Sequence, residues 1–394
     1  MKKKNIKILI LQRIIPHYRT GFFKKFCERF PGTNIFYGQP SSSESLSNAR
    51  SLDKNIFKAC GNLYLNSSGS IFFSRIYFKL FKHNPDIVIS VFNVGNLNIY
   101  LLFLLRPILN FKIILWSFGY DPVRGFDPEN NFADKIRLRL SQKADAVIYY
   151  WDKGKETVSK FSKRTEHYFT APNTLDTDKL FLLKKEFDLK GKEEIKKELG
   201  IKEVYNFIYT GRLLKDKEVD ILLRAFSLIE QKRNDCRLTI IGSGPEMDNL
   251  KKLSSSLSLK NIYFLNEILD DAVTGKWIYS SDAFVMPGRL GLSVVHSFSF
   301  GTPIISQNKE GHFHGEGIGY IKDGINGFLV KDQDINALAE KMEYIISNNK
   351  NDNNESISNK FRANAFSTAV NDASIEKMMS GFEEAVGFCL KETD

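Results

Sequence analysis

Short apolar runs alternate with longer segments of helical periodicity along nearly the whole chain, and this alternation restricts the fold more than any other feature. Short apolar runs bounded by polar, glycine or proline positions indicate strands that are buried on both faces. Strands of this kind pair in parallel, and each parallel pair needs a crossover connection, which the helical segments provide. The sequence therefore predicts an α/β fold whose parallel sheets are covered by helices on both faces.

The expected strands fall into two series. The first series comprises Ile6–Leu11, Asn34–Tyr37, Asp86–Val91, Lys112–Trp116 and Asp145–Tyr150. The second series comprises Tyr205–Thr210, Arg237–Ile241, Asn261–Leu265, Ala283–Met286 and Pro303–Ser306. Helices are expected between them, among others at Gly21–Phe30, Asn131–Ser141 and Lys153–Phe161.

A break separates the two series. The segment Ala171–Asp176 interrupts the alternation, and the charged stretch Lys184–Lys197 follows it. A chain of 394 residues also has a length typical of two domains. We therefore predict an N-terminal domain over 1–180 and a C-terminal domain over 181–372.

Charge and cysteine content narrow the classes of partner. Lys and Arg outnumber Asp and Glu by 56 to 46, which favours an anionic partner such as nucleotide phosphates, a phospholipid surface or nucleic acid. Nucleic acid is the least favoured of the three, because no zinc-finger spacing, RNP-type strand or basic region accompanies the charge. The four cysteines have no CxxC spacing, so we expect reduced thiols in a cytoplasmic protein, with neither disulfides nor a metal site.

Two segments bear on membrane contact. The most apolar stretch, 99–118, contains Arg106, Pro107 and Lys112, so it predicts a helix ending near Arg106 and then a strand, not a spanning helix. The segment 71–82 mixes aromatic residues at helical spacing with cations. This pattern fits an interfacial helix resting on anionic lipid, and equally a core-facing helix with an exposed basic side.

Two loops carry candidate binding chemistry. After the strand Tyr205–Thr210 come Gly211, Arg212 and Lys217 ahead of a helix, an arrangement that suits a diphosphate and equally a solvated charged loop. The second loop, 287–291, follows another buried strand, and a helix is expected to start near Gly291. The first-turn amides of that helix would be open to an anion. Those amides belong to Gly291, Leu292 and Ser293.

The order of these segments resembles the large family 4 of retaining glycosyltransferases, which has the GT-B fold. The resemblance covers most of the chain and rests on the N-terminal strand and loop, ADAVIYY, APNTLDT, GRLLKDKEVDILLRAF, IGSGPE, SDAFVMPGRLGLSVVHSFSFGTPII and IKDGINGFLV. It implies two Rossmann-like domains facing across a cleft, with a final helix at about 373–394 crossing back to the first domain. It also implies a hexosyltransferase-type enzyme that uses a nucleotide diphosphate sugar and needs no metal or other cofactor.

The resemblance assigns roles to matching positions. Arg212 and Lys217 look like the pair that binds the donor diphosphate and stabilises the leaving nucleotide. Asn266, Glu267 and Ile268 are similar to the loop that borders the base, and the segment Gly291 to Ser293 would hold phosphate at the helix start.

The chain also departs from the family pattern. Family members carry two glutamates, which contact the transferred sugar and the ribose, where this chain has Gly288 and His296. His296 could still accept one ribose hydroxyl, or it is simply a packed helix residue. The family histidine after the fourth strand is missing as well, because the loop following Trp116 reads Ser-Phe-Gly-Tyr.

Two loops are candidates to compensate for these departures. His17 follows the first strand, and Glu316 ends the histidine-containing run 312–316, from which a carboxylate could touch sugar hydroxyls. For both residues the alternative is a solvated or structural role.

The combined prediction is a glycosyltransferase that moves a sugar to an acceptor hydroxyl with retention, in surface polysaccharide synthesis (O-antigen, capsule or lipopolysaccharide) at the inner face of the cell membrane. Its acceptor would be a glycan or a lipid-linked glycan, with Arg13, Arg19 and Arg124 as candidates to meet acceptor phosphates. Two alternatives stay open. One is a retired GT-B subunit that binds a glycan or a partner enzyme, and the other is a nucleotide-sugar epimerase.

Overall fold

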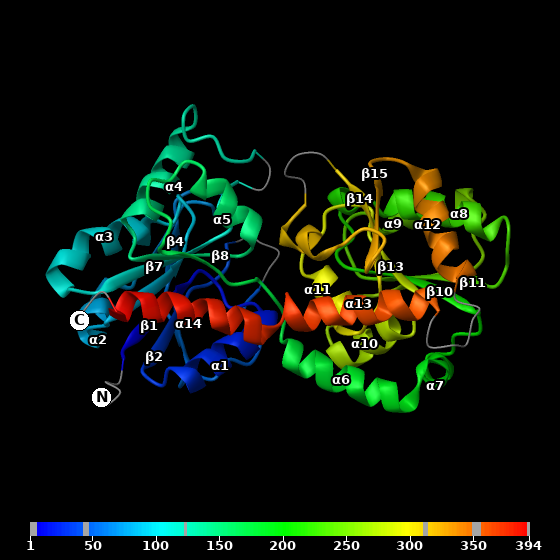
Figure 1. The fold of residues 1–394 in the computed structure, drawn as a ribbon, viewed down its shortest axis with the longest axis horizontal. Helices are drawn as coiled ribbons and strands as arrows, with labels where there is room; N and C mark the ends of the chain where they lie inside the picture. The colour runs from blue at the N-terminus through cyan, green and yellow to red at the C-terminus, as the bar shows by residue number, and fades with distance from the viewer. Residues whose placement is uncertain (1–5, 42–46, 122–123, 310–313, 349–355, 392–394) are drawn as a thin grey trace. The chain divides into compact units, whose positions relative to one another are not determined.

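The computed structural model describes residues 6–41, 47–121, 124–309, 314–348 and 356–391, and the chain divides into two compact units. The first unit comprises Met1–Asp176 and Ile375–Asp394, and the second comprises Thr177–Ser374. Each unit contains one parallel sheet covered by helices (Figure 1). The predicted α/β class with two Rossmann-like sheets is confirmed.

The first unit is built on a seven-stranded sheet in the order β3-β2-β1-β6-β7-β8-β9, in which every pair of neighbours is parallel. Its strands are β1 (Ile8–Gln12), β2 (Thr33–Tyr37), β3 (Phe57–Ala59), β6 (Ile87–Val91), β7 (Lys112–Ser117), β8 (Ala146–Tyr149) and β9 (Tyr168–Thr170). A separate antiparallel hairpin consists of β4 (Asn62–Tyr64) and β5 (Phe72–Ser74). The helices of this unit are η1 (His17–Arg19), α1 (Thr20–Arg29), α2 (Tyr77–His83), α3 (Leu97–Leu109), α4 (Phe132–Lys143), α5 (Asp152–Ser159) and α14 (Ile375–Lys391).

Alternating residues of the strands fill two different cores. Ile8 and Ile10 of β1 belong to the cluster that contains Phe22 of α1 and Phe382 of α14. Leu9 of β1 belongs to a second cluster, which contains side chains of α2 and α3. Because side chains alternate across a strand, α1 and α14 cover one face of this sheet, and α2 and α3 cover the other.

The C-terminal helix α14 returns to the first unit, as predicted. Phe382 packs against Trp116 of β7, with ring centroids 5.0 Å apart. Gly381 lies so close to β9 that a Cβ atom there would stand 2.2 Å from the Thr170 carbonyl oxygen. The helix is therefore an integral part of this sheet's cover, although it follows the second unit in sequence.

The second unit is built on a six-stranded parallel sheet in the order β12-β11-β10-β13-β14-β15. Its strands are β10 (Tyr205–Thr210), β11 (Cys236–Ile241), β12 (Ile262–Leu265), β13 (Ala283–Val285), β14 (Ile304–Asn308) and β15 (Gly327–Lys331). Its helices are α6 (Thr177–Lys190), α7 (Lys192–Glu198), η2 (Lys215–Lys217), α8 (Val219–Glu230), α9 (Met247–Ser256), α10 (Asp271–Tyr279), α11 (Ser293–Ser299), η3 (Glu316–Tyr320), α12 (Ile335–Ser347) and α13 (Ile357–Asn371). The loops after β10, β13 and β14 leave the sheet at its carboxyl edge, where ligands of open α/β sheets bind.

The segment 71–82 is helical only from residue 77 onward, so the prediction of a helix over the whole segment was wrong for its first half. Phe72–Ser74 forms β5, and the helix α2 begins only at Tyr77. The hairpin requires an extended backbone at Phe72, where the strand pairs with Tyr64 of β4, and this long-range pairing is not visible in the local aromatic spacing.

The apolar stretch 99–118 contains the end of helix α3, which includes Pro107. The helix ends at Leu109, three residues beyond the predicted end near Arg106. No helix in the described part of the chain is both long and apolar enough to cross a membrane.

Candidate functional site

The loop after β10 is fixed by backbone hydrogen bonds to the neighbouring strand. The amide of Gly211 donates to the Ile241 carbonyl at 3.0 Å, and the hydroxyl of Tyr209 donates to the Arg212 carbonyl at 2.9 Å. Gly211 has φ of 152°, which glycine tolerates far better than other residues do. The Arg212 side chain is exposed. The loop thus presents an exposed guanidinium at the carboxyl end of a central strand.

Lys217 joins this loop to the loop that follows β13. Its Nζ donates to the Arg289 carbonyl at 2.5 Å. Two backbone hydrogen bonds run alongside, from the Gly288 amide to the Lys217 carbonyl at 3.1 Å and from the Arg289 amide to the Asp216 carbonyl at 2.8 Å. Loops that are 70 residues apart in sequence therefore form one hydrogen-bonded unit.

Positive charge gathers in this unit. Burial lowers the pKa of Lys217, and the nearby Arg289 and Arg212 lower it further, while Asp216 acts in the opposite direction. Arg289 and Arg212 therefore both lie within electrostatic range of the Lys217 ammonium. A polyanion is the ligand that would relieve their repulsion, and a diphosphate supplies several acceptor oxygens.

Gly288 has no room for a side chain. A Cβ atom at this position would stand 2.3 Å from both the Asp216 carbonyl oxygen and the Lys217 carbonyl carbon. The close contact of the two loops therefore requires glycine here. The missing carboxylate follows from the way the loops pack, because any side chain at this position would push them apart.

A third loop packs on the second one through His314. The Leu290 amide donates to His314 Nδ1 at 3.2 Å, and His314 Nε2 lies 2.9 Å from the Gln307 carbonyl. This arrangement requires the neutral tautomer with hydrogen on Nε2. Burial lowers the pKa of His314 to about 4, with Lys309 and Lys217 contributing in the same direction. A neutral histidine thus ties the Leu290 loop to the end of β14.

The His314 contacts predict a pH dependence of stability. An unfolded histidine has a pKa of about 6.5, so between pH 6.5 and 4 the unfolded chain binds more protons than the folded one. The unfolding free energy should therefore fall as the pH drops through this window, by up to about 1.4 kcal/mol per pH unit from this group. Urea midpoints of the wild type and His314→Gln, measured from pH 7 to 4, check this. Glutamine retains a donor and an acceptor but does not titrate, and equal pH slopes in the two proteins would contradict the assignment.

Glu316 lies in the same region, at the start of η3, and is 9% exposed. The Gly315 amide donates to the Leu290 carbonyl at 3.1 Å, and a Cβ atom at Gly317 would stand 2.3 Å from the Gly291 carbonyl oxygen. The backbone around Glu316 is therefore packed directly on Leu290 and Gly291. Residues 312 and 313 of the candidate run 312–316 lie outside the described part of the chain.

The helix after this loop, α11, begins at Ser293, two residues later than the predicted start near Gly291. Gly291 and Leu292 precede it, and their carbonyls accept from the amides of Val294 and His296 at 3.2 and 3.0 Å. The His296 ring is half-buried and lies 5.6 Å from the Phe300 ring. Gly291, Leu292, Ser293 and His296 therefore belong to the same corner of the unit as Arg289.

Asn266 and Ile268 follow β12, which lies two places from β10 in the sheet order. The Asn266 side chain is exposed, and the Ile268 carbonyl accepts from the Thr274 hydroxyl at 3.1 Å. Asp270 then caps α10 by accepting from the Ala272 amide at 2.8 Å. These contacts hold the 266–270 loop at the carboxyl edge of the sheet.

Comparison with known proteins identifies the second unit. Residues 191–365 match the family described as glycosyl transferases group 1, and this range contains the three loops above. The matched range lies within Thr177–Ser374, so it is the second unit that belongs to this family.

Individual relatives of this chain are distant. An uncharacterized glycosyltransferase of Methanocaldococcus jannaschii is 28% identical over 236 residues, which is 57% of this chain and 56% of that protein. The capsular polysaccharide biosynthesis glycosyltransferase CapM of Staphylococcus aureus is 28% identical over 197 residues, 48% of each chain. This chain thus spans about half the length of the curated relatives it matches.

The overall fold is similar to that of solved structures. The structure of HepE from Anabaena in complex with UDP superposes with a TM-score of 0.70 at 16% identity and covers 97% of this chain and 100% of HepE. At this identity the likeness concerns the GT-B fold alone.

In the first unit, the cations considered for the acceptor differ in environment. Arg19 is buried, its guanidinium lies 4.4 Å from the centre of the Trp116 ring, and it donates to Gln12 and Asn173. Arg124 pairs with the buried Asp134 at 2.5 Å, which raises the Arg124 pKa.

The other two candidates of the first unit are more accessible. Arg13 is half-buried, with its guanidinium 6.0 Å from the centre of the Phe72 ring. His17 is exposed at the start of η1, and its carbonyl accepts from the Thr20 hydroxyl at 2.8 Å.

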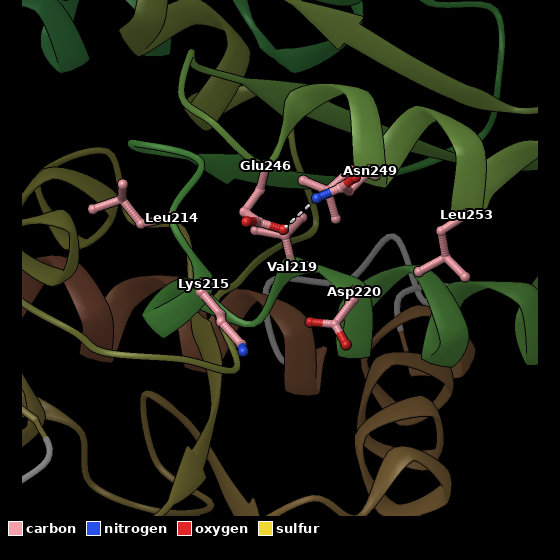
Figure 2. A pocket seen from close by; sticks show the side chains of 8 residues that line it. Leu214, Lys215, Val219, Asp220, Glu246, Asn249 and Leu253 are labelled. Atoms are coloured by element: carbon pink, nitrogen blue, oxygen red, sulfur yellow. Dashed lines mark hydrogen bonds between the residues drawn. The ribbon is translucent and has the colours of Figure 1, made fainter.

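A pocket lies beside the loop that contains Arg212 and Lys217, but neither of these two residues lines it. Figure 2 shows it between the start of α8 and α9, with Lys215 on its rim near Asp220 and Glu246. Its volume is about 240 Å³, and its remaining lining residues are Leu214, Val219, Asn249, Leu250 and Leu253. Ligand pockets usually measure about 300–1,000 Å³. Lys215 therefore lines a separate, small pocket, although it lies between the two predicted binding residues in sequence.

Sequence reasoning missed two residues of this group 1 site. Arg289 adds the third cation, and its carbonyl holds Lys217. His314 holds Leu290 in place. Arg289 had a detectable signal, because it is a cation directly after the Pro-Gly turn that follows β13. His314 stood in the candidate run 312–316, for which a structural role was the alternative, but its bridge between two loops depends on tertiary packing that the sequence does not show.

Proposed function

We propose that this protein transfers a sugar from a nucleotide diphosphate sugar to an acceptor hydroxyl, with retention of configuration. The main observation behind this proposal is the hydrogen-bonded pair of loops in which Lys217 Nζ donates to the Arg289 carbonyl, with Arg212 nearby. Three cations at the carboxyl edge of a Rossmann-like sheet suit a diphosphate better than any other common ligand.

The comparisons support the same class of donor. HepE has the same fold and was crystallised with UDP, and CapM acts in capsular polysaccharide biosynthesis. We infer by analogy that this chain uses a nucleotide diphosphate sugar and acts in the synthesis of a surface polysaccharide such as capsule, O-antigen or lipopolysaccharide.

In this proposal the cations stabilise the leaving group. As the bond between the anomeric carbon and the phosphate oxygen breaks, negative charge grows on the departing nucleotide diphosphate. Arg212 and Lys217 meet that charge with donors that are already in position. Lys217 is well suited, because its burial and its contact with Arg289 restrict the movement of its ammonium group. The chemistry assigned to these residues requires no metal ion.

The remaining site residues take the roles that the family resemblance assigns. The backbone of Gly291, Leu292 and Ser293 contacts phosphate, the loop containing Asn266 and Ile268 borders the base, and His296 accepts a ribose hydroxyl. Glu316, packed beside Gly291, contacts hydroxyls of the transferred sugar. His17 in the first unit contacts the acceptor, a glycan or a lipid-linked glycan.

Donor binding provides the test of the proposed site. A nucleotide sugar at 100 times its dissociation constant should stabilise the protein by about 2.7 kcal/mol, visible as a rise in melting temperature. Arg212→Ala and Lys217→Ala each remove charged hydrogen bonds, so we expect donor affinity to fall by about 10- to 100-fold. At a 100-fold loss, the same donor concentration stabilises by only about 0.4 kcal/mol.

Lys215→Ala is the matched control for this experiment. It removes a lysine from the same short helix, η2, but Lys215 lines the neighbouring pocket (Figure 2). We expect this variant to bind the donor like the wild type. Equal losses in all three variants would show that only general positive charge matters, and no stabilisation of the wild type by any donor would refute the proposed donor site.

A second candidate function is favoured by Gly288, whose packing excludes the carboxylate that family members use next to the sugar. A protein of this kind could bind the donor and act as a subunit that holds a glycan or a partner enzyme. Donor stabilisation without release of the nucleotide in the presence of glycan acceptors would favour this alternative over the transferase.

We further propose that the protein acts in the cytoplasm at the inner face of the cell membrane. This location would bring it to a lipid-linked acceptor, and a surface of the first unit supports it.

A further inference from the structure

The outward faces of α2 and α3 carry large apolar side chains. On α2, Phe78 is 77% exposed and Phe81 is 53% exposed, while on α3 Leu104 is 68% and Ile108 is 70% exposed. Tyr100, one turn before Leu104, is 37% exposed. Tyr100, Leu104 and Ile108 are spaced at i, i+4 and i+8, so they form a single stripe along α3. The solvent side of a helix normally carries polar residues, whereas the solvent sides of α2 and α3 carry these large apolar side chains.

Both helices direct these stripes away from the same sheet face. The inward residues Leu80 of α2 and Leu102 of α3 are fully buried in one core cluster. Phe78 and Leu104 lie on the opposite sides of their helices, so both stripes face outward over the same layer of the first unit. Figure 1 shows the two helices in the cyan part of that unit. We call the outward residues Arg75, Phe78, Phe81, Lys82, Tyr100, Leu104 and Ile108 the α2–α3 face.

The charge around α2 is mainly positive. From residue 75 to residue 109 the chain contains four cations, Arg75, Lys79, Lys82 and Arg106, and one acidic residue, Asp86. The Asp86 carboxylate already accepts from the Lys7 amide at 2.8 Å, and Arg106 on α3 pairs with Asp145 at 3.1 Å. Arg75 and Lys82 flank the two phenylalanines of α2 and are exposed. The stretch that builds α2 and α3 therefore has a net charge of +3, with its exposed cations beside the phenylalanines of α2.

From these observations we infer that the α2–α3 face docks onto a membrane surface containing anionic lipid. Exposed aromatic and aliphatic side chains enter the boundary between headgroups and acyl chains, and neighbouring cations bind anionic headgroups. A second copy of the chain is a poorer occupant, because two such faces would place like charges opposite each other. The inference gives the proposed membrane location a specific surface, and its test uses neither donor nor acceptor.

Vesicle flotation of the full chain tests the inference. We expect the wild type to float with phosphatidylcholine vesicles that contain about 30% phosphatidylglycerol, and to bind pure phosphatidylcholine far more weakly. Binding should fall at about 0.5 M salt, where charges are screened beyond a few ångströms. Arg75→Gln with Lys82→Gln should lower the affinity for anionic vesicles by about tenfold or more, since each cation near such a surface contributes.

The apolar stripes have a matched control in the second unit. Phe78→Ser, Phe81→Ser, Leu104→Ser and Ile108→Ser together should reduce vesicle binding by at least about tenfold. Leu182→Ser with Leu189→Ser removes comparably exposed leucines, 65% and 84% exposed, from α6 and should leave binding unchanged. All six residues are exposed, so the variants should retain the wild-type melting temperature.

Three outcomes would overturn the inference. They are an absence of wild-type flotation at low salt, equal loss in the α6 control, and a concentration-dependent dimer that the α2–α3 substitutions abolish while vesicles stay unbound. Because the assay requires no sugar transfer, a protein that floats but binds no nucleotide sugar would refute the proposed function alone.

Discussion

Asp282→Asn should destabilise the second unit by about 3 kcal/mol, the lower end of the cost of breaking a buried ion pair, because Asp282 is buried while its partner Lys192 keeps 23% of its side chain exposed. The Asp282 carboxylate, 1% exposed, accepts from Lys192 Nζ at 2.6 Å and from the Asn206 amide at 2.7 Å. Burial lowers the pKa of Lys192 to about 8, whereas Asp282 favours its charged form. Without the carboxylate, the half-buried ammonium has lost its anionic partner and still lies within electrostatic range of the half-buried Arg362 guanidinium.

The melting temperature measures this effect. For a unit of this size a loss of about 3 kcal/mol corresponds to a decrease of about 6–12 °C. The control is Asp271→Asn, which breaks the exposed pair between Lys179 and Asp271 at 2.7 Å and should cost at most about 1 kcal/mol. Adding Lys192→Met to Asp282→Asn removes the unpaired charge and should recover most of the loss. A melting temperature of Asp282→Asn equal to that of the control would contradict the argument.

Strands that are buried along nearly their whole length were predictable in both units. The expected strand Tyr205–Thr210 coincides with β10, and the expected Lys112–Trp116 is one residue shorter than β7. Such strands are continuous apolar runs, so the signal lies within the strand itself. By contrast, β3, β4, β5, β9 and β15 were missed, because each depends on pairing with another segment. Local sequence carries little information about such pairs.

Part of the candidate site could be proposed from local sequence. Arg212 and Lys217 were proposed because a glycine turn and two cations precede a helix, a pattern that is local in sequence. The contact of Lys217 with Arg289 and the bridge made by His314 join loops distant in sequence. Gly288 had been recognised only as a departure from the family pattern. Its physical reason, the approach of the Asp216–Lys217 backbone, is visible only in three dimensions.

Gly288→Glu should destabilise the protein and fail to restore the missing carboxylate. A Cβ atom at Gly288 would lie 2.3 Å from the Asp216 carbonyl oxygen and 2.5 Å from Lys217 Cα, whereas real Cβ atoms essentially never approach closer than 3.0 Å. The obstructing atoms belong to the backbone, so one of the two loops has to move. We expect a loss of roughly 3 kcal/mol or more, at the upper end of the cost of overpacking.

Gly288→Ala separates the steric effect from the charge. The clash begins at Cβ, so alanine should lower the melting temperature nearly as much as glutamate does. Gly291→Ala is the control for stability, because a Cβ atom there meets nothing within 4 Å. Moving either loop would also break the hydrogen bond from Lys217 to the Arg289 carbonyl, so donor stabilisation should disappear together with the lost stability. If Gly288→Glu instead kept the wild-type melting temperature and increased sugar transfer, the loop would be adaptable, and the absence of the glutamate would not follow from packing.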